Sequence, residues 1–92
     1  MPALSPEQAV SRLAALPKWQ IEDGKLKRTF SFKDFTASLA FVNRVGEQAE
    51  KACHHPGIDI RYNRVRLSLV THDEGGLTAK DFDLAAAADK LA

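Results

Sequence analysis

The sequence predicts an α+β two-layer sandwich, in which a four-stranded antiparallel sheet carries three helices on one face in the order αββαββα. Three observations support this: two hairpin-like pairs of alternating segments, three segments of helical periodicity, and their regular alternation along the 92 residues. A chain of this length forms one small domain, taken as residues 1–92. Its modest core makes self-association a common source of additional stability.

Composition and charge narrow the functional classes. The chain has 13 basic and 12 acidic residues and a net charge of +1, which argues against a dedicated nucleic-acid binder with a basic stripe. The single cysteine excludes an internal disulfide and fits a reducing compartment. No signal pattern opens the chain, and no apolar run approaches the roughly 18 residues of a membrane span. We therefore expect a cytoplasmic protein with no membrane partner.

The first helix is predicted to begin at Ser5. A capping serine, Pro6 at the first helical position and Gln8 three residues after the cap are typical of a helix start. Pro17 is expected to end the helix. The apolar stripe expected to face the core consists of Val10, Leu13 and Ala14.

Asp23-Gly24 separates two alternating runs, Trp19–Glu22 and Lys25–Phe32. This dipeptide favours a two-residue type I′ turn, because both central positions of that turn need a positive φ. A hairpin is therefore predicted, and its pairs are Ile21 with Leu26 and Glu22 with Lys25.

A long amphipathic helix is predicted over Lys33–Cys53, capped by Ser31 with Asp34 following, and stopped by Pro56-Gly57. Its apolar residues recur at three- and four-residue steps: Phe35, Leu39, Val42, Val45, Ala49 and Ala52, with Phe41 beside the stripe. His54 and His55 then lie at or just past the helix C-terminus, where the last carbonyls favour a protonated imidazole.

The second predicted hairpin has alternating apolar residues in both arms. A two-residue turn at Asn63-Arg64 places all of them on one face, with the pairs Tyr62 and Val65, Ile60 and Leu67, and Ile58 and Leu69. Extending this register by three pairs predicts that His55 lies opposite His72. It also places Arg61 opposite Arg66, where like charges need an anion, an acidic partner or solvent between them. With so small a net charge, a solvated or interface face is favoured over a DNA surface.

The last helix is predicted to begin at Thr78–Asp81, a capping box, with Leu77 and Phe82 spaced for a hydrophobic staple. On local grounds alone, Asp81 is a helix-cap residue. The residues expected to face inward are Phe82, Ala85, Ala86 and Leu91.

The three histidines, His54, His55 and His72, are the clearest candidates for chemistry. The unperturbed imidazole pKa is about 6.5, so this side chain gives and takes protons near neutrality. Nothing resembling a nucleophile motif or a phosphate-binding loop occurs elsewhere in the sequence. The histidines therefore predict proton-transfer chemistry.

The spacing of these residues matches a known pattern. The chain resembles the signature of the pterin-4a-carbinolamine dehydratases. The matching residues and the gaps between them are Glu50, three residues, His54-His55-Pro56, five residues, Tyr62, nine residues, His72, eight residues and Asp81. The similarity runs from about Trp19 to the C-terminus. Flanking segments that agree are Phe30–Phe35, Tyr62–Val65 and Thr71–Asp73.

The resemblance implies a reaction and a set of site residues. Members of this family dehydrate a 4a-hydroxytetrahydropterin to a quinonoid dihydropterin, which supports tetrahydropterin recycling and requires no metal or other cofactor. The implied catalytic residues are His54, His55 and His72. The implied substrate-binding residues are Cys53, His54, His55, Val70, Thr71, His72 and Asp73, with Glu50, Asp81 and Trp19 in support. Glu50 would orient or charge-couple His54, and the ring of Trp19 would pack on the pterin.

The resemblance also implies partners. Family members are described as tetramers of paired dimers with continuous sheets, so a homodimer or homotetramer is expected, with a pterin-dependent hydroxylase in the same pathway. Strand edges without proline favour such association. One departure concerns affinity, because many members carry an aromatic residue where this chain has Ile58, beside His55-Pro56.

Several of these residues also have purely structural interpretations. Tyr62 is favoured as a core residue because it shares a predicted face with Ile58 and Ile60. Trp19 fits the hairpin core as well as it fits the site. Cys53 is expected to be a passive thiol that contributes its backbone.

Two other functions fit parts of the sequence. The first is a non-catalytic dimerisation or coactivator-type binding module of the same fold, which would need no trio of histidines. The second is a metal site built from Cys53, His54, His55 and His72. It is disfavoured because adjacent ligands point in divergent directions, whereas structural zinc sites usually space paired ligands by two or more residues. The sequence therefore favours the enzyme.

Overall fold

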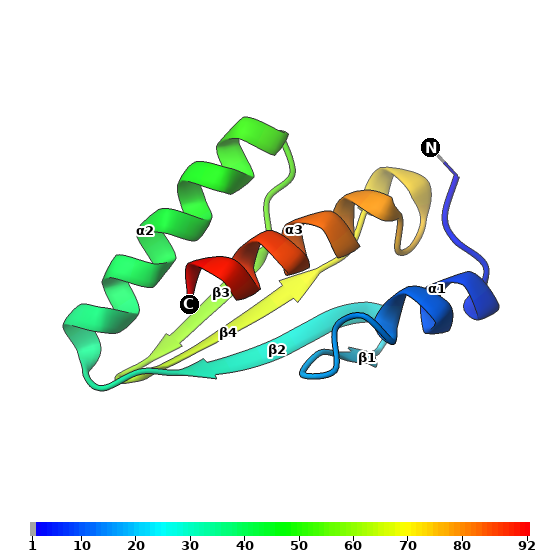
Figure 1. Ribbon diagram of the computed structural model, residues 1–92. Coiled ribbons are helices and arrows are strands. Elements are labelled where there is room, and N and C mark those ends of the chain that lie inside the picture. Colours follow the sequence, from blue (N-terminus) through cyan, green and yellow to red (C-terminus); the bar gives the residue numbers. More distant parts are fainter. Residues whose placement is uncertain (1) are drawn as a thin grey trace.

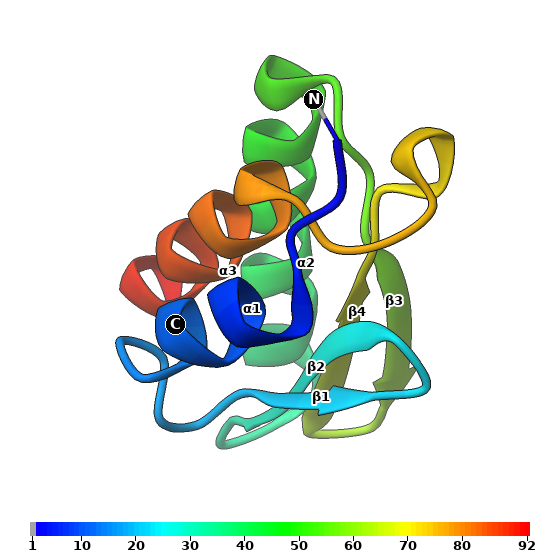
Figure 2. The same ribbon diagram turned by 90° about the vertical axis from the view of Figure 1, so that its right-hand side faces the viewer.

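The computed structural model describes residues 2–92 and has the predicted order of elements. The helices are α1 (Pro6–Leu13), α2 (Phe35–Ala52) and α3 (Ala79–Leu91), and a short 3₁₀ turn, η1 (His72–Glu74), precedes α3. The strands are β1 (Gln20–Glu22), β2 (Lys25–Ser31), β3 (Gly57–Arg61) and β4 (Arg64–Leu69). The three helices cover one face of the sheet (Figures 1 and 2), which confirms the predicted two-layer sandwich.

The sheet is antiparallel throughout and has the strand order β1-β2-β4-β3. The two long central strands, β2 and β4, pair Leu26 with Leu69 and Phe30 with Val65, and all four side chains are buried beneath the helices. The sheet edges are β1 and β3. Within residues 2–92, no helix is long and apolar enough to cross a membrane.

The first hairpin has the predicted register. Ile21 lies opposite Leu26 and Glu22 lies opposite Lys25. Asp23 and Gly24 both take positive φ angles, 53° and 73°, as a type I′ turn requires. The predicted turn and its pairs are confirmed.

The second hairpin is displaced from the predicted register by two residues. Its tight turn is Tyr62-Asn63 rather than Asn63-Arg64, so Ile60 faces Val65 and Ile58 faces Leu67. A two-residue shift keeps the same side chains on the same face, because side chains alternate with a period of two. The predicted opposition of His55 and His72 is therefore wrong, since ladder pairing ends at Gly57 and Ser68.

Asn63 accounts for this register. Its carbonyl oxygen accepts a hydrogen bond from the Phe32 N–H (2.8 Å), and its side-chain Nδ2 donates to the Phe32 carbonyl (3.1 Å). These bonds hold Asn63 inside the turn and leave Tyr62 at its tip with a positive φ of 52°. Tyr62 is 67% exposed, so its predicted place in the core is wrong.

The capping box of α1 is confirmed, with the Gln8 N–H donating to Ser5 Oγ and the Ser5 N–H donating to Gln8 Oε1. The helix ends at Leu13, before Pro17, because the chain tightens into a turn that buries Leu16. The predicted stripe is wrong at Val10 and Ala14, which are exposed, whereas Ala9 is buried and Leu13 is partly buried.

The predicted cap and stripe of α2 are also corrected. Asp34, not Ser31, caps the helix and accepts a hydrogen bond from the Ala37 N–H (2.8 Å), while Ser31 belongs to β2. Phe35 and Leu39 are 46% and 40% exposed, and Ala52 is exposed as well. The residues of α2 that are buried are Ser38, Phe41, Val45 and Ala49. Phe41 is thus a core residue whose ring packs at a tilt against those of Phe30 and Phe32, and this contact turns the predicted stripe partly toward solvent.

The start of α3 is as predicted. The Thr78–Asp81 capping box is present, and Leu77 and Phe82 are both buried. Of the residues expected to face inward, Phe82 and Ala85 are buried and Ala86 and Leu91 are partly buried against the core. Two further residues of this helix, Leu84 and Ala88, are also buried.

Candidate active site

The C-terminus of α2 separates the two adjacent histidines. Cys53 takes a left-handed conformation (φ 51°, ψ 40°), the Cys53 N–H donates to the Glu50 carbonyl, and the His54 N–H donates to the Ala49 carbonyl. These two bonds form a Schellman motif, which turns the chain sharply at the helix end. As a result His54 is buried, only 9% exposed, whereas the His55 side chain is 63% exposed.

Cys53→Gly is expected to raise the free energy of unfolding by about 0.5 kcal/mol. The left-handed conformation costs a residue with a side chain about 1 kcal/mol, and the greater freedom of glycine in the unfolded chain offsets part of the gain. Urea denaturation measures the difference. The matched control is Cys53→Ser, which keeps a Cβ and should show no gain; a glycine variant less stable than the serine variant would contradict the prediction.

His54 is paired with Asp81. Its Nε2 lies 2.6 Å from Asp81 Oδ1, although 27 positions separate the two residues in sequence. Asp81 belongs to the first turn of α3 and is 0% exposed. The predicted helix cap is therefore also the direct partner of a candidate catalytic histidine.

Two threonines complete the surroundings of Asp81. Asp81 Oδ2 accepts hydrogen bonds from the Thr71 hydroxyl (2.8 Å) and from the Thr78 N–H (2.9 Å). The hydroxyls of Thr71 and Thr78 lie 2.9 Å apart, so Thr78 donates to Thr71 when Thr71 donates to Asp81. All three residues are buried, which makes this a closed polar network in an apolar surrounding.

This network determines which nitrogen of His54 carries a proton. An ionised Asp81 carboxylate only accepts hydrogen bonds, so it accepts one from His54 Nε2–H as well as those from the threonines. Nδ1 is then the ring nitrogen available to a substrate. The negative charge of Asp81 also stabilises the imidazolium that forms when Nδ1 takes up a proton.

Glu50 contacts His55, not His54. Its Oε2 forms a short hydrogen bond with His55 Nε2, and both side chains are well exposed. The predicted coupling of Glu50 to His54 is wrong because the turn at Cys53 sends His54 inward, away from the face of α2 that carries Glu50. An exposed pair of this kind contributes little to stability.

His72 is the first residue of η1 and is exposed. Within residues 2–92 its side chain has no hydrogen bond or ion pair, so both ring nitrogens face solvent. Its neighbour Thr71 ties this segment to Asp81 and hence to His54. Figures 1 and 2 place η1 and the α2–β3 connection at the same end of the molecule. Of the other predicted substrate-binding residues, Val70 is half-buried and Asp73 is exposed.

Trp19 belongs to the core. It is 2% exposed, its ring meets Phe30 edge to face, and its Nε1–H donates to Asp89 Oδ1 (2.8 Å). Asp89 follows Asp81 by eight positions on α3, which corresponds to about 12 Å along a helix. The expectation that Trp19 packs on the substrate is therefore not supported, and the structural interpretation holds.

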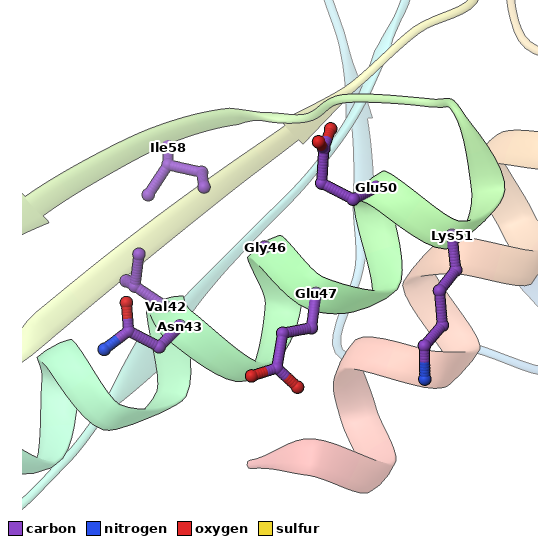
Figure 3. Close-up of a pocket in the computed structure, with 7 residues that line it drawn as sticks. All are labelled: Val42, Asn43, Gly46, Glu47, Glu50, Lys51 and Ile58. Carbon is purple, nitrogen blue, oxygen red and sulfur yellow. The ribbon is translucent and has the colours of Figure 1, made fainter.

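A groove of about 840 Å³ runs beside α2. It is lined by Val42, Asn43, Gly46, Glu47, Glu50, Lys51 and Ile58. In Figure 3, Ile58 of β3 faces Val42 of α2 across the groove, and Glu50 lies at the end next to the α2–β3 connection. The same carboxylate therefore borders the groove and contacts His55.

Sequence reasoning did not predict that Thr78 belongs to the hydrogen-bond network of Asp81. The capping box already explains a threonine at this position, so nothing in the sequence connects Thr78 with His54. Among residues 2–92, no group of three or more His, Cys, Asp or Glu side chains is placed to hold a metal ion. The Cys53 thiol is exposed, and His54 Nε2 is occupied by Asp81.

Comparison with known proteins gives consistent matches over the whole chain. A model of the Pterin 4 alpha carbinolamine dehydratase family matches residues 2–91. A protein of Acidobacterium capsulatum, provisionally named a pterin-4-alpha-carbinolamine dehydratase, is 56% identical over 91 residues and covers 99% of each chain. A protein of Chloroflexus aurantiacus with the same provisional name is 55% identical, covering 99% of this chain and 98% of its own.

Solved structures agree with these matches. The transcriptional coactivator/pterin dehydratase from Brucella melitensis has a TM-score of 0.94 and 36% identity, with 98% of each chain covered. A pterin dehydratase-like protein described as a RuBisCO assembly factor in the alpha-carboxysome has a TM-score of 0.67 and 23% identity, covering 79% of this chain and 84% of its own. The second comparison shows a shared fold alone.

The fold and site define an α+β sandwich whose helix ends hold a buried histidine–aspartate pair. The match over nearly all of the chain makes the assignment specific: the chain belongs to the pterin carbinolamine dehydratase family, a family of hydro-lyases. The resemblance found in the sequence is confirmed.

Proposed function

We propose that this chain dehydrates a 4a-hydroxytetrahydropterin to quinonoid dihydropterin and water, and so supports tetrahydropterin recycling in the cytoplasm after a pterin-dependent hydroxylase. The observation that carries the proposal is the buried His54–Asp81 pair, which lies within the residues that the family model matches. A buried carboxylate fixed by three hydrogen bonds to protein is suited to support proton transfer by its histidine partner.

The reaction removes a hydroxyl from one ring atom and a proton from a neighbouring nitrogen. One protein group must therefore protonate the departing oxygen, while another accepts the proton of the nitrogen. In the proposal His54 Nδ1 is the acceptor, because Asp81 stabilises the imidazolium that results. His55 is the donor, because its exposed ring lies beside His54 and is held by the Glu50 carboxylate. General acid–base catalysis of this kind contributes roughly 10²–10⁴-fold.

The proposed substrate contacts come from two segments, Cys53–His55 and Val70–Asp73. The Thr71 hydroxyl is used by Asp81, and its N–H and carbonyl are bonded to Gly76 and Glu74. In the proposal Thr71 therefore positions its neighbours and Asp81, and any contact with the pterin is through packing. His72 supplies an exposed third imidazole that is free to bind or to exchange a proton.

A dehydration assay with freshly generated 4a-hydroxytetrahydropterin tests this function. The rate above buffer background should rise in proportion to protein concentration and should survive exhaustive chelation, since imidazoles alone move the protons. A rate no faster than buffer would reject the enzyme. Activity that disappeared with the chelator and returned with zinc would replace the histidine mechanism with a metal site.

A non-catalytic binding module is the second candidate, because the solved Brucella relative is described as both coactivator and dehydratase. The observation in this chain that favours it is the exposure of large apolar side chains on α2 and β3: Phe35, Leu39 and Ile58. The same dehydration assay separates the two candidates, because a pure adaptor would not exceed background.

We further propose that the chain forms a homodimer or homotetramer. The edge strand β3 (Gly57–Arg61) has unpaired backbone groups on one side, and the exposed part of α2 borders an apolar groove. Closed two-fold contacts are the commonest arrangement for one kind of chain. Light scattering coupled to size exclusion at micromolar concentration should give at least twice the chain mass of 10.1 kDa. A mass near that of one chain would reject association without affecting the catalytic proposal.

A further inference from the structure

The face of the sheet that the helices leave open carries three arginines around one hollow. Val65 and Leu67 of β4 point into the core, so the alternating neighbours Arg64 and Arg66 point to the open face. The hollow has a volume of about 220 Å³. Its lining consists of Thr29, Asp59, Arg61, Arg64 and Arg66, from three adjacent strands and the end of the second hairpin.

The charges at this hollow are not balanced within the protein. Arg61 lies directly opposite Arg64 across the ladder, an arrangement that is unfavourable for like charges. Arg61 has an ion pair with Asp59 (3.5 Å), and Arg66 has one with Glu22 (3.3 Å), on the side away from Arg64. Within residues 2–92, Arg64 has no ion pair or side-chain hydrogen bond. Three guanidinium groups thus face one carboxylate in the hollow, with Glu22 compensating Arg66 in part.

We propose that this hollow, between Arg61, Arg64 and Arg66, binds the phosphate group of a small ligand. Asp59 pairs with Arg61, and Glu22 is shared between Arg66 and Lys27, so the hollow keeps between one and two uncompensated positive charges, which favours an anion. A phosphate has enough oxygens to accept from more than one guanidinium group, whereas a single carboxylate has only two. Guanidinium groups donate paired N–H bonds to phosphate oxygens, and the Thr29 hydroxyl adds a neutral donor at the floor. The bound anion would also remove the repulsion between Arg61 and Arg64.

The phosphate site is distinct from the histidine site. His54 and Asp81 belong to the helix layer, whereas the hollow opens on the opposite face of the sheet. The inference therefore does not depend on the dehydratase activity, and either can fail without the other.

Titration of the isotope-labelled protein with inorganic phosphate, followed by amide NMR at low ionic strength and about pH 8, tests the site. We expect saturable shifts centred on Thr29 and Arg64 that weaken as salt is added, because exposed charges are screened. Arg64→Gln should weaken phosphate binding about tenfold, as expected for loss of a charged hydrogen-bond donor. The matched control is Arg12→Gln on α1, which removes the same charge from an exposed position and should leave affinity unchanged.

A second variant separates ligand binding from structural damage. Asp59→Asn removes the one carboxylate that lines the hollow, so it should strengthen phosphate binding about threefold, whereas a merely destabilising change would weaken it. A parallel titration with glycerol 3-phosphate identifies the source, since tighter binding than inorganic phosphate indicates a phosphate monoester and equal or weaker binding indicates the free ion. Shifts that do not saturate, equal affinity in Arg64→Gln, or malonate binding as tightly as phosphate would each overturn the proposal.

Discussion

His54→Ala and His72→Ala are each expected to slow dehydration by about tenfold or more, and the double variant should lose less than the product of the two effects. The physical reason is that residues acting as one proton-transfer unit do not contribute independently. Stopped-flow measurement on freshly generated substrate, with the uncatalysed rate subtracted, gives the three rates. Full activity in the double variant would rule out the catalytic assignment.

The two variants differ in their effect on stability, and this difference serves as the control. His72 is exposed and unpaired in the described chain, so His72→Ala should change the free energy of unfolding by no more than about 0.5 kcal/mol. His54→Ala leaves Asp81 Oδ1 without its partner in a buried place, which costs about 1–3 kcal/mol. An activity loss in the His72 variant therefore reports chemistry alone.

Asp81→Ala is expected to lower activity about 100-fold and stability by about 3 kcal/mol. The substitution removes the support of the His54 imidazolium and, at the same time, the acceptor for the Thr71 hydroxyl and the Thr78 N–H. Thermal or urea unfolding measures the stability loss, and the dehydration assay, run well below the melting temperature of the variant, measures the activity.

Two further variants separate the roles of Asp81. Asp83→Ala removes an exposed carboxylate from the same helix and should change neither property, as a matched control. Asp81→Asn can still accept the Thr78 N–H bond, so it should recover most of the stability. It places an amide beside His54 Nε2, disfavours the tautomer that leaves Nδ1 free, and should remain nearly as inactive as the alanine variant. An active Asp81→Asn enzyme would contradict the proposed role of the carboxylate.

The elements that sequence alone predicted well are those whose signals are local. Asp23-Gly24 defines its hairpin because two adjacent residues meet the backbone needs of one turn. The capping boxes at Ser5 and Thr78 each span one helical turn, and both are present as predicted. Such patterns are complete within a few residues, so tertiary packing has little opportunity to alter them.

The errors arose where a distant contact overrides the local preference. The sequence prediction placed the second turn at Asn63-Arg64, but hydrogen bonds between Asn63 and Phe32 hold it at Tyr62-Asn63, with Tyr62 at a positive φ that is disfavoured for a bulky residue. The buried face of α2 depends on the aromatic cluster around Phe41, which no helical period reveals.

The sequence named all three histidines and Asp81 as candidates but did not predict how they are arranged. The pairing of His54 with Asp81 depends on how the end of α2 packs against the start of α3. Their register-based convergence through the second hairpin was wrong, and the partner of Glu50 was wrong for a related reason. The left-handed turn at Cys53 could not be predicted, because the residue there is not a glycine, the usual sequence signal for this conformation.

The two oxygens of Asp81 form hydrogen bonds with different groups, and this difference affects how related sequences should be interpreted. Oδ1 contacts His54 Nε2. Oδ2 accepts hydrogen bonds from the Thr71 hydroxyl and from the Thr78 N–H, which caps the first turn of α3. A descendant that lost catalysis would still gain a well-formed helix from Oδ2, so selection for folding alone would retain the aspartate. An aspartate at this position is therefore a weak indicator of activity. Under the proposed mechanism, a histidine at position 54, whose buried ring takes no part in helix initiation, is the more discriminating marker.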